Sequence, residues 1–147
     1  MEETLTPAAI YRQIMNHADE TLPKPARDNL DVVIDANWIF LHSKRFKEHN
    51  RLNSYRYIGK WKYNPSDHAE LLEQAKNLLL HVSENSLPVV KITNFGNMPN
   101  SELQLVVYCF PGIAEPSSVK EILLESRLNG FYWGSNRFAE PIESNLL

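Results

Sequence analysis

Hydrophobic and polar residues alternate with a period of two between Tyr55 and Tyr63. The stretch YRYIGKWKY places Tyr55, Tyr57, Trp61 and Tyr63 on one side and Arg56, Ile58, Lys60 and Lys62 on the other. This period is typical of a β-strand with one buried face. We therefore expect a strand here, with its aromatic side toward the core and its cationic side facing away.

A helical period follows this strand. Asn64-Pro65 precedes apolar residues that recur three or four positions apart, at Ala69, Leu72, Ala75, Leu79 and Val82. This spacing predicts a helix from about Pro65 to about Glu84. Farther along, Ser118 and Glu121 form a capping box, which predicts a second helix to about Leu128, ended by Asn129-Gly130.

Three more segments in this half of the chain have the composition of strands. They are LPVVKITNF (87–95), ELQLVVYCF (102–110) and FYWGSNRF (131–138). The turn sequence GNMPNS joins the first two, so we expect these to be neighbours in the sheet.

The first 54 residues have a less regular pattern. Thr6-Pro7 can cap a helix that ends near Asp19, and the proline-containing segment 21–30 is expected to be a loop or arm. Segment 31–45 is apolar enough for one strand, beginning near Val32 or Asn37. Segment 46–54 is predicted to be a polar connection.

The order of elements from Tyr55 is strand, helix, strand, strand, helix, strand, after one helix and one strand. This order predicts an α+β fold with a mostly antiparallel sheet and helices on one face. The other face is expected to be exposed unless the N-terminal helix or arm covers it. We expect a single domain over residues 1–147, with an N-terminal helix and arm (1–30), an α+β core (31–138) and a loose tail (139–147).

The same alternation brings several polar side chains to the face away from the helices. If Val90 and Ile92 point inward, Lys91 points outward with Lys60, Lys62 and Tyr108. Such a cationic patch suits phosphate, sulfate or carboxylate groups. The alternative is that these lysines only keep a wet sheet face soluble or protect an edge.

Composition narrows the function classes. The chain has 147 residues, of which 43% are hydrophobic and 22% charged, and its net charge of −3 does not favour an extended nucleic-acid surface. The single cysteine, Cys109, excludes an internal disulfide, and the five histidines lack metal-ligand spacing. Cys109, Trp61 and Trp133 are expected to be core residues.

No apolar run approaches a membrane span and no signal-peptide pattern is present, so we expect a cytoplasmic protein without membrane partners. Export as a signal-less effector would give the same pattern. The chain also lacks a glycine-rich phosphate loop and a serine nucleophile motif.

The segments GKWKYN, HAELLEQA, VVKITN, LQLVVYCF and SVKEILLESRLNGFYWG together resemble a known family. They are similar to the phosphothreonine lyase domain-containing family of small proteins and, more distantly, to the bacterial effector phosphothreonine lyases. The resemblance covers about residues 55 to 138.

The resemblance implies β-elimination of phosphate from phosphothreonine, without metal or cofactor. By position, Lys91 matches the base, and Lys60, Tyr108 and Arg137 match phosphate-binding residues; Arg56, in register with Lys60, joins this set. Lys62 stands where the effector enzymes have a proton-donating histidine. In those enzymes an arginine that precedes the tyrosine in sequence binds the phosphate. The corresponding segment here, NFGNMPNSELQ, has no arginine.

Three readings follow from these observations. The chain binds a phosphorylated ligand, a phosphopeptide or a nucleotide, without turning it over; or it is an active lyase that uses Lys91 and Lys62; or it is a protein-interaction domain with no small-molecule ligand. The two departures from the family pattern favour binding. The sequence leaves the oligomeric state open.

Overall fold

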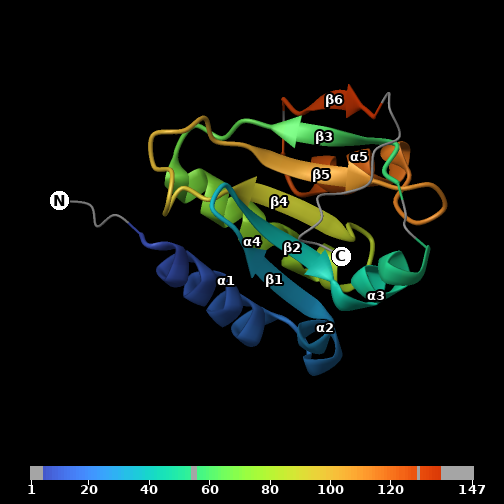
Figure 1. Ribbon diagram of the computed structural model, residues 1–147, viewed down its shortest axis with the longest axis horizontal. Helices are drawn as coiled ribbons and strands as arrows, with labels where there is room; N and C mark the ends of the chain where they lie inside the picture. Colours follow the sequence, from blue (N-terminus) through green and yellow to red (C-terminus); the bar gives the residue numbers. More distant parts are fainter. Residues whose placement is uncertain (1–4, 54–55, 129, 137–147) are drawn as a thin grey trace.

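Six strands form one antiparallel sheet in the computed structural model, which describes residues 5–53, 56–128 and 130–136. Their order across the sheet is β1-β2-β4-β5-β3-β6 (Figure 1), and every neighbouring pair is antiparallel. The strands are β1 Leu30–Ile34, β2 Trp38–Ser43, β3 Gly59–Tyr63, β4 Val89–Thr93, β5 Leu105–Cys109 and β6 Tyr132–Ser135. The predicted α+β class and the order of elements from β3 to β6 are confirmed.

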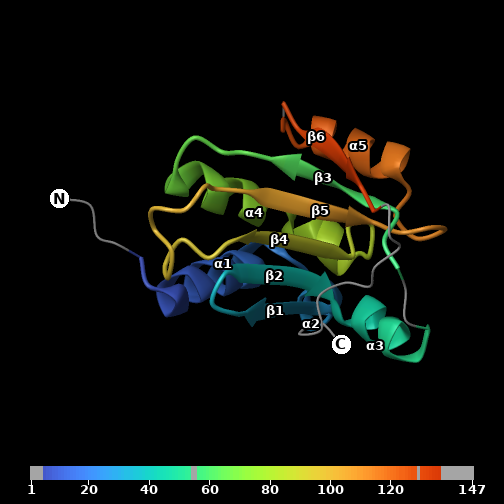
Figure 2. The same cartoon turned by 45° about the horizontal axis from the view of Figure 1, so that its top comes forward.

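Helices cover one face of this sheet. The helices within the described residues are α1 Pro7–Thr21, α2 Lys24–Asp28, α3 Lys44–Asn53, α4 His68–Ser83 and α5 Pro116–Glu125. Figure 2 shows α1, α4 and α5 behind the sheet. In that layer α4 packs on β2 and β4, α5 packs on β3 and β5, and α1 packs beside α4. The N-terminal helix therefore does not cover the opposite face of the sheet. Such a cover was the alternative to an exposed face.

The main hydrophobic core lies between the sheet and these helices. It includes Leu71, Leu78 and Leu79 of α4 together with Val90 and Val107 of the central strands, all fully buried. Trp61 packs against this core, whereas Lys60 is on the other side of β3, as the alternation predicts. Cys109 is also a core residue, as expected, whereas Trp133 is 37% exposed on the edge strand β6, so its expected place in the core is wrong.

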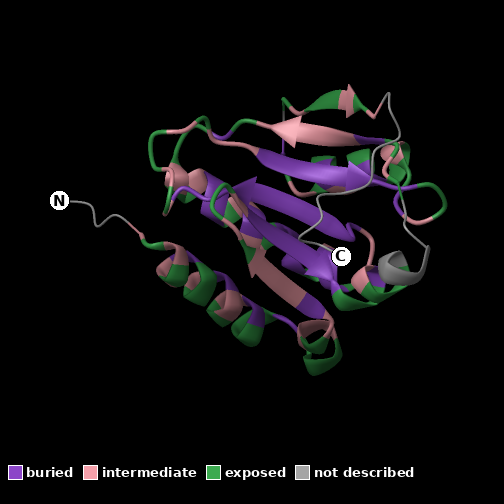
Figure 3. Ribbon diagram, in the orientation of Figure 1, coloured by how far each residue is buried: buried purple, intermediate pink, exposed green. Residues whose placement is uncertain are grey.

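The opposite face of the sheet carries a second buried cluster, so the expectation of an exposed face is wrong at its centre. The cluster consists of Phe40, Phe46, Val89, Val106, Tyr108 and Phe110. Figure 3 shows β4 and β5 buried along their length, whereas β3 is intermediate and β6 is mostly exposed. Uninterrupted apolar runs such as LVVYC are typical of strands covered on both faces.

The first half of the chain differs most from the prediction. Segment 31–45 is not one strand: β1 and β2 form a hairpin, in which Asp35 Oδ1 accepts hydrogen bonds from the backbone N–H groups of Asn37 and Trp38. The predicted arm contains α2, and the predicted polar connection is α3. Phe46 anchors α3 by packing on Phe110, with ring centroids 4.6 Å apart.

Two helix starts also differ from their predicted positions. Helix α4 begins at His68 because Asp67 is its N-cap and accepts a hydrogen bond from Glu70 N, so Asn64-Pro65 lies before the helix. Helix α5 begins at Pro116 rather than at the predicted capping box around Ser118. The start of α1 is as predicted, since Thr6 Oγ1 accepts a hydrogen bond from Ala9 N. The predicted end of the second helix near Leu128 is wrong, because α5 ends at Glu125 with Ser126 as its C-cap and Arg127 in the left-handed region. The predicted tail 139–147 lies outside the described residues.

Candidate anion site on the sheet

The Gly-Lys-Trp strand positions three neighbouring residues for three different contacts. A Cβ atom on Gly59 would lie 2.3 Å from the Trp133 ring, so only glycine lets β3 and β6 pair at this point. Trp61 points into the helix layer and donates from Nε1 to the Pro116 carbonyl over 3.1 Å. Lys60, between them, is thereby directed to the opposite face, where it pairs with Tyr108 of β5.

Two lysines approach the same tyrosine ring on that face. Lys60 Nζ lies 5.8 Å and Lys91 Nζ lies 5.4 Å from the centroid of the Tyr108 ring. The three residues come from β3, β4 and β5, which are adjacent in the sheet. Because like charges repel, two ammonium groups around one ring create a place where an anion is favoured. We call Lys60, Lys91 and Tyr108 the lysine–tyrosine cluster.

Lys91 is the most buried cation of this cluster. It is 4% exposed, and its Nζ lies 4.0 Å from the Trp38 ring centroid and 6.0 Å from that of Phe40. Aromatic ring faces attract a cation and so offset part of the cost of removing it from water. The sequence correctly predicts the face on which Lys91 and Tyr108 lie, but both are buried there rather than exposed.

Lys62 shares this face but not the cluster. Direct strand pairing places Lys91 and Lys62 on either side of Val106 of β5. Their backbones are therefore two strands apart, about 10 Å. Lys62 Nζ lies 5.8 Å from the centroid of Tyr132 in β6, and its side chain passes over Gly134. The position expected to supply the acid is thus directed toward the sheet edge.

The other two predicted phosphate-binding residues are Arg56 and Arg137. Arg56 is exposed and precedes the first residue of β3, so its place in the site stays a prediction. Arg137 lies outside the described residues. The expected position of Tyr57 beside Trp61 is wrong: a bend at Ile58 interrupts the alternation, and Tyr57 packs edge-on against Tyr108 with centroids 4.9 Å apart.

Sequence reasoning missed two aromatic residues beside the cluster, Trp38 and Tyr57. Tyr57 lies 6.0 Å, ring centroid to Nζ, from Lys60, and Trp38 lies beside Lys91. The signal for Trp38 was present in WIFLHS, where Trp38, Phe40 and His42 alternate with Ile39 and Leu41. Without the hairpin, however, this segment had no partner strand that could place Trp38 against Lys91.

A buried histidine lies on the same face of the sheet, farther from the cluster. His42 is 1% exposed and pairs with Asp31 on one side and Val89 on the other. Neither ring nitrogen has a hydrogen-bond partner among the described residues, although Nε2 lies 3.5 Å from Asp31 Oδ2. Burial lowers the pKa of His42, and the nearby Asp31 carboxylate opposes this only in part.

The cysteine is unsuited to nucleophilic chemistry. Burial raises the pKa of the Cys109 thiol to about 12, with a smaller contribution from the Glu115 carboxylate. The reactive form of a cysteine is the thiolate, so this residue has a packing role.

Two other kinds of feature are absent from the described segments. No three or more His, Cys, Asp or Glu side chains within them gather at a distance suitable for a metal ion. None of the helices in this part of the chain combines the length and hydrophobicity that a membrane span requires.

Comparison of the chain with protein-family models, with curated proteins and with solved structures finds no match.

Proposed function

We propose that this protein binds a phosphorylated ligand through the lysine–tyrosine cluster. The observation that carries the proposal is the approach of two ammonium groups, those of Lys60 and Lys91, to within 6 Å of one tyrosine ring centroid. A phosphate dianion offsets their mutual repulsion, and lysine ammonium groups donate charge-assisted hydrogen bonds to it. The resemblance noted above supports the same assignment, because it rests on the same three residues.

The differing burial of the two lysines suggests how a ligand approaches. Lys60 is half-buried, whereas Lys91 and Tyr108 are buried. A phosphate group therefore meets Lys60 first, with Lys91 beneath it as the deeper cation. Low solvent exposure at the deeper position strengthens the attraction between an ammonium group and an anion.

Calorimetry with a phosphothreonine peptide, a nucleoside monophosphate and inorganic phosphate tests this proposal. Lys60→Ala should weaken binding of the best of these probes by about 1.5 to 3 kcal/mol, the scale of losing a hydrogen bond to a charged group. Lys120→Ala is the matched control, since Lys120 lies on α5 with its Nζ 5.9 Å from the Trp61 ring on the other side of the sheet. Equal losses in both variants, or no binding of any probe, would refute the proposal.

A further inference from the structure

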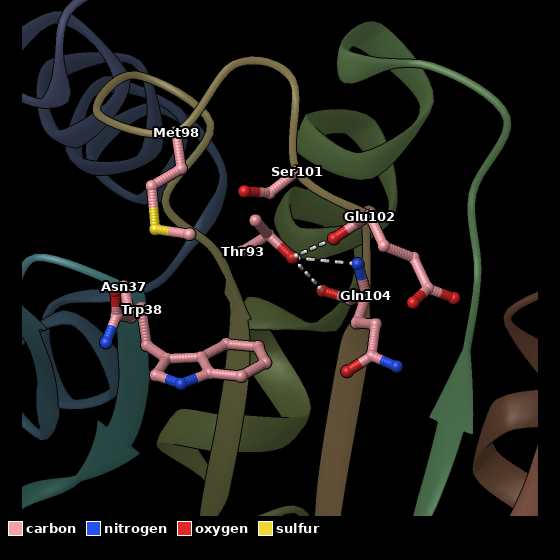
Figure 4. A pocket seen from close by; sticks show the side chains of 7 residues that line it. All are labelled: Asn37, Trp38, Thr93, Met98, Ser101, Glu102 and Gln104. Atoms are coloured by element: carbon pink, nitrogen blue, oxygen red, sulfur yellow. Dashed lines mark hydrogen bonds between the residues drawn. The ribbon is translucent and has the colours of Figure 1, made fainter.

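A pocket of about 430 Å³ lies beside Trp38 of β2 and Thr93 of β4 (Figure 4). It is lined by Asn37, Trp38, Thr93, Met98, Ser101, Glu102 and Gln104, and we call it the Trp38 pocket. Its volume falls within the range of small-molecule sites, about 300 to 1,000 Å³. None of the lining residues is cationic, so the pocket itself does not suit a phosphate group.

The walls of the Trp38 pocket suit a flat aromatic group. The indole of Trp38 and the thioether of Met98 lie on opposite sides of the space in Figure 4. Trp38 lines the pocket and also lies 4.0 Å, ring centroid to Nζ, from Lys91. An indole ring can stack on any of the nucleobases, and a methionine side chain packs favourably on aromatic rings.

Polar groups around these walls can read the edge of a base. The side-chain amides of Asn37 and Gln104 form no hydrogen bond with the described part of the chain, whereas Thr93 Oγ1 is already used, accepting from Gln104 N over 2.8 Å. A side-chain amide presents a donor and an acceptor together, the pattern that adenine complements. The only charged lining residue is Glu102; its Oε1 accepts from Asn64 Nδ2 over 3.1 Å, and its carboxylate repels phosphate.

The pocket and the lysine–tyrosine cluster are neighbours on one face of the sheet. Thr93 of the pocket and Lys91 of the cluster are two residues apart on β4, so their side chains share a face about 6.6 Å apart along the strand. Trp38 links the two, because it lines the pocket and contacts Lys91. One ligand with a phosphate and a ring joined by a short linker can therefore occupy both.

We infer that the phosphorylated ligand is a nucleotide whose base stacks on Trp38, an inference that rests on the proposed phosphate site. The phosphate lies at Lys60 and Lys91, the sugar crosses the Lys91–Thr93 interval, and the base enters the Trp38 pocket. A phosphothreonine side chain has no group to fill this pocket, which is why the geometry favours the nucleotide.

Titration of the full chain with AMP, ribose 5-phosphate, adenosine and a phosphothreonine peptide tests this inference. AMP should bind at least about tenfold more tightly than ribose 5-phosphate, since stacking on one aromatic side chain is worth about that factor or more. AMP should also quench the fluorescence of Trp38. Trp38→Leu should reduce AMP affinity to that of ribose 5-phosphate and abolish the quenching.

Three variants make the result specific. Trp133→Phe, at the far edge of the sheet, should keep both AMP affinity and quenching. Gln104→Ala should weaken AMP without changing ribose 5-phosphate, and it provides a second test if Trp38→Leu does not fold. Lys60→Ala should weaken AMP and ribose 5-phosphate by the same factor.

The possible failures can be told apart. If AMP binds no better than ribose 5-phosphate, or less tightly than the phosphopeptide, while Lys60→Ala still weakens the phosphorylated probes, the nucleotide assignment is overturned and the phosphate site stands. If adenosine binds as well as AMP and Lys60→Ala has no effect on either, the phosphate site is overturned and the nucleotide inference with it.

Discussion

Lys60 and Tyr108 are directly paired across β3 and β5, and Lys60 Nζ lies 5.8 Å from the centroid of the tyrosine ring. The pairing fixes both side chains on one face, because directly opposite residues of an antiparallel pair point the same way. Lys91 approaches the same ring from β4 but is buried. The cluster thus contains one accessible cation and one buried cation. Mutation of each lysine alone measures its separate contribution.

Replacement of Lys91 by methionine should separate binding from stability. A buried cation carries a desolvation cost, whereas methionine keeps the length of the side chain and contacts aromatic rings well. We expect Lys91→Met to abolish phosphate binding while the chain stays folded, as measured by urea denaturation. Lys60→Met is the partner control, because Lys60 is only half-buried. A loss of several kcal/mol in Lys91→Met alone would indicate a structural role for this lysine.

Gly59 should tolerate a methyl group only if Trp133 is made smaller. A Cβ at Gly59 would lie 2.3 Å from the Trp133 ring, and also 2.7 Å from the Gly134 carbonyl oxygen. We expect Gly59→Ala to destabilise the fold by about 1 to 3 kcal/mol, the usual cost of overpacking. Urea denaturation of Gly59→Ala, Trp133→Ala and the double variant measures this cost.

The double variant is the informative one in that series. Its free energy of unfolding should be higher than the sum of the single effects predicts, since Trp133→Ala removes the ring that the new methyl group would meet. Additive effects would show that the neighbouring backbone oxygen, rather than the indole, excludes a side chain at this position.

The second half of the chain could be predicted from sequence because local pattern and tertiary contact agree there. Lys60 and Trp61 lie on opposite faces as the alternation predicts, and β4 and β5 pair as expected. Alternation assigns a residue to a face but gives no depth, so it could not show that Lys91 is buried. That burial depends on Trp38 and Phe40, which reach Lys91 only through the pairing of β2 with β4.

The first half was harder to predict because its turns and helices lack strong local signals. The β1–β2 turn contains no glycine and is held by the Asp35 carboxylate. Helix α3 is largely polar and is anchored by the contact between Phe46 and Phe110, which are distant in sequence. Both features depend on specific contacts that periodicity does not reveal.

Stability should fall in mildly acidic solution because of His42. Burial lowers the pKa of this histidine below the ordinary value of 6.5, so the unfolded chain binds a proton at a higher pH than the folded chain does. The free energy of unfolding should therefore decrease as pH falls below about 6.5, until the folded-state pKa is passed. Asp31 opposes this shift, while Lys47 and Lys44 reinforce it.

His42→Phe should flatten this part of the pH profile. Urea denaturation between pH 7.5 and about 5 should show a smaller loss of stability in the variant than in the natural chain. His81→Phe serves as the control, since His81 lies on α4 and is only partly buried. A profile for His42→Phe as steep as that of the natural chain would assign the acid sensitivity to other groups.

The natural chain should show little or no β-elimination of phosphothreonine. In the resembled mechanism Lys91 is the base, and the acid position is held by Lys62. The ammonium of Lys62 points to Tyr132, 5.8 Å from its ring centroid, and Val106 separates its strand position from that of Lys91. Ammonium groups are weak general acids near neutral pH, and a well-placed acid is typically worth about 10² to 10⁴ in rate.

Mass spectrometry of a phosphothreonine peptide incubated with the protein measures this directly, through the loss of phosphoric acid that converts the residue to dehydrobutyrine. We expect no conversion by the natural chain. Lys62→His restores the histidine of the resembled enzymes. Its side chain is still directed along β3 toward the β6 edge, so we expect conversion to remain low in this variant too. Rapid conversion by the natural chain, abolished by Lys91→Ala and unchanged by Lys120→Ala, would replace the binding function with a lyase activity. In that event Lys62, or a side chain outside the described residues, would have to reach the leaving phosphate when substrate is bound.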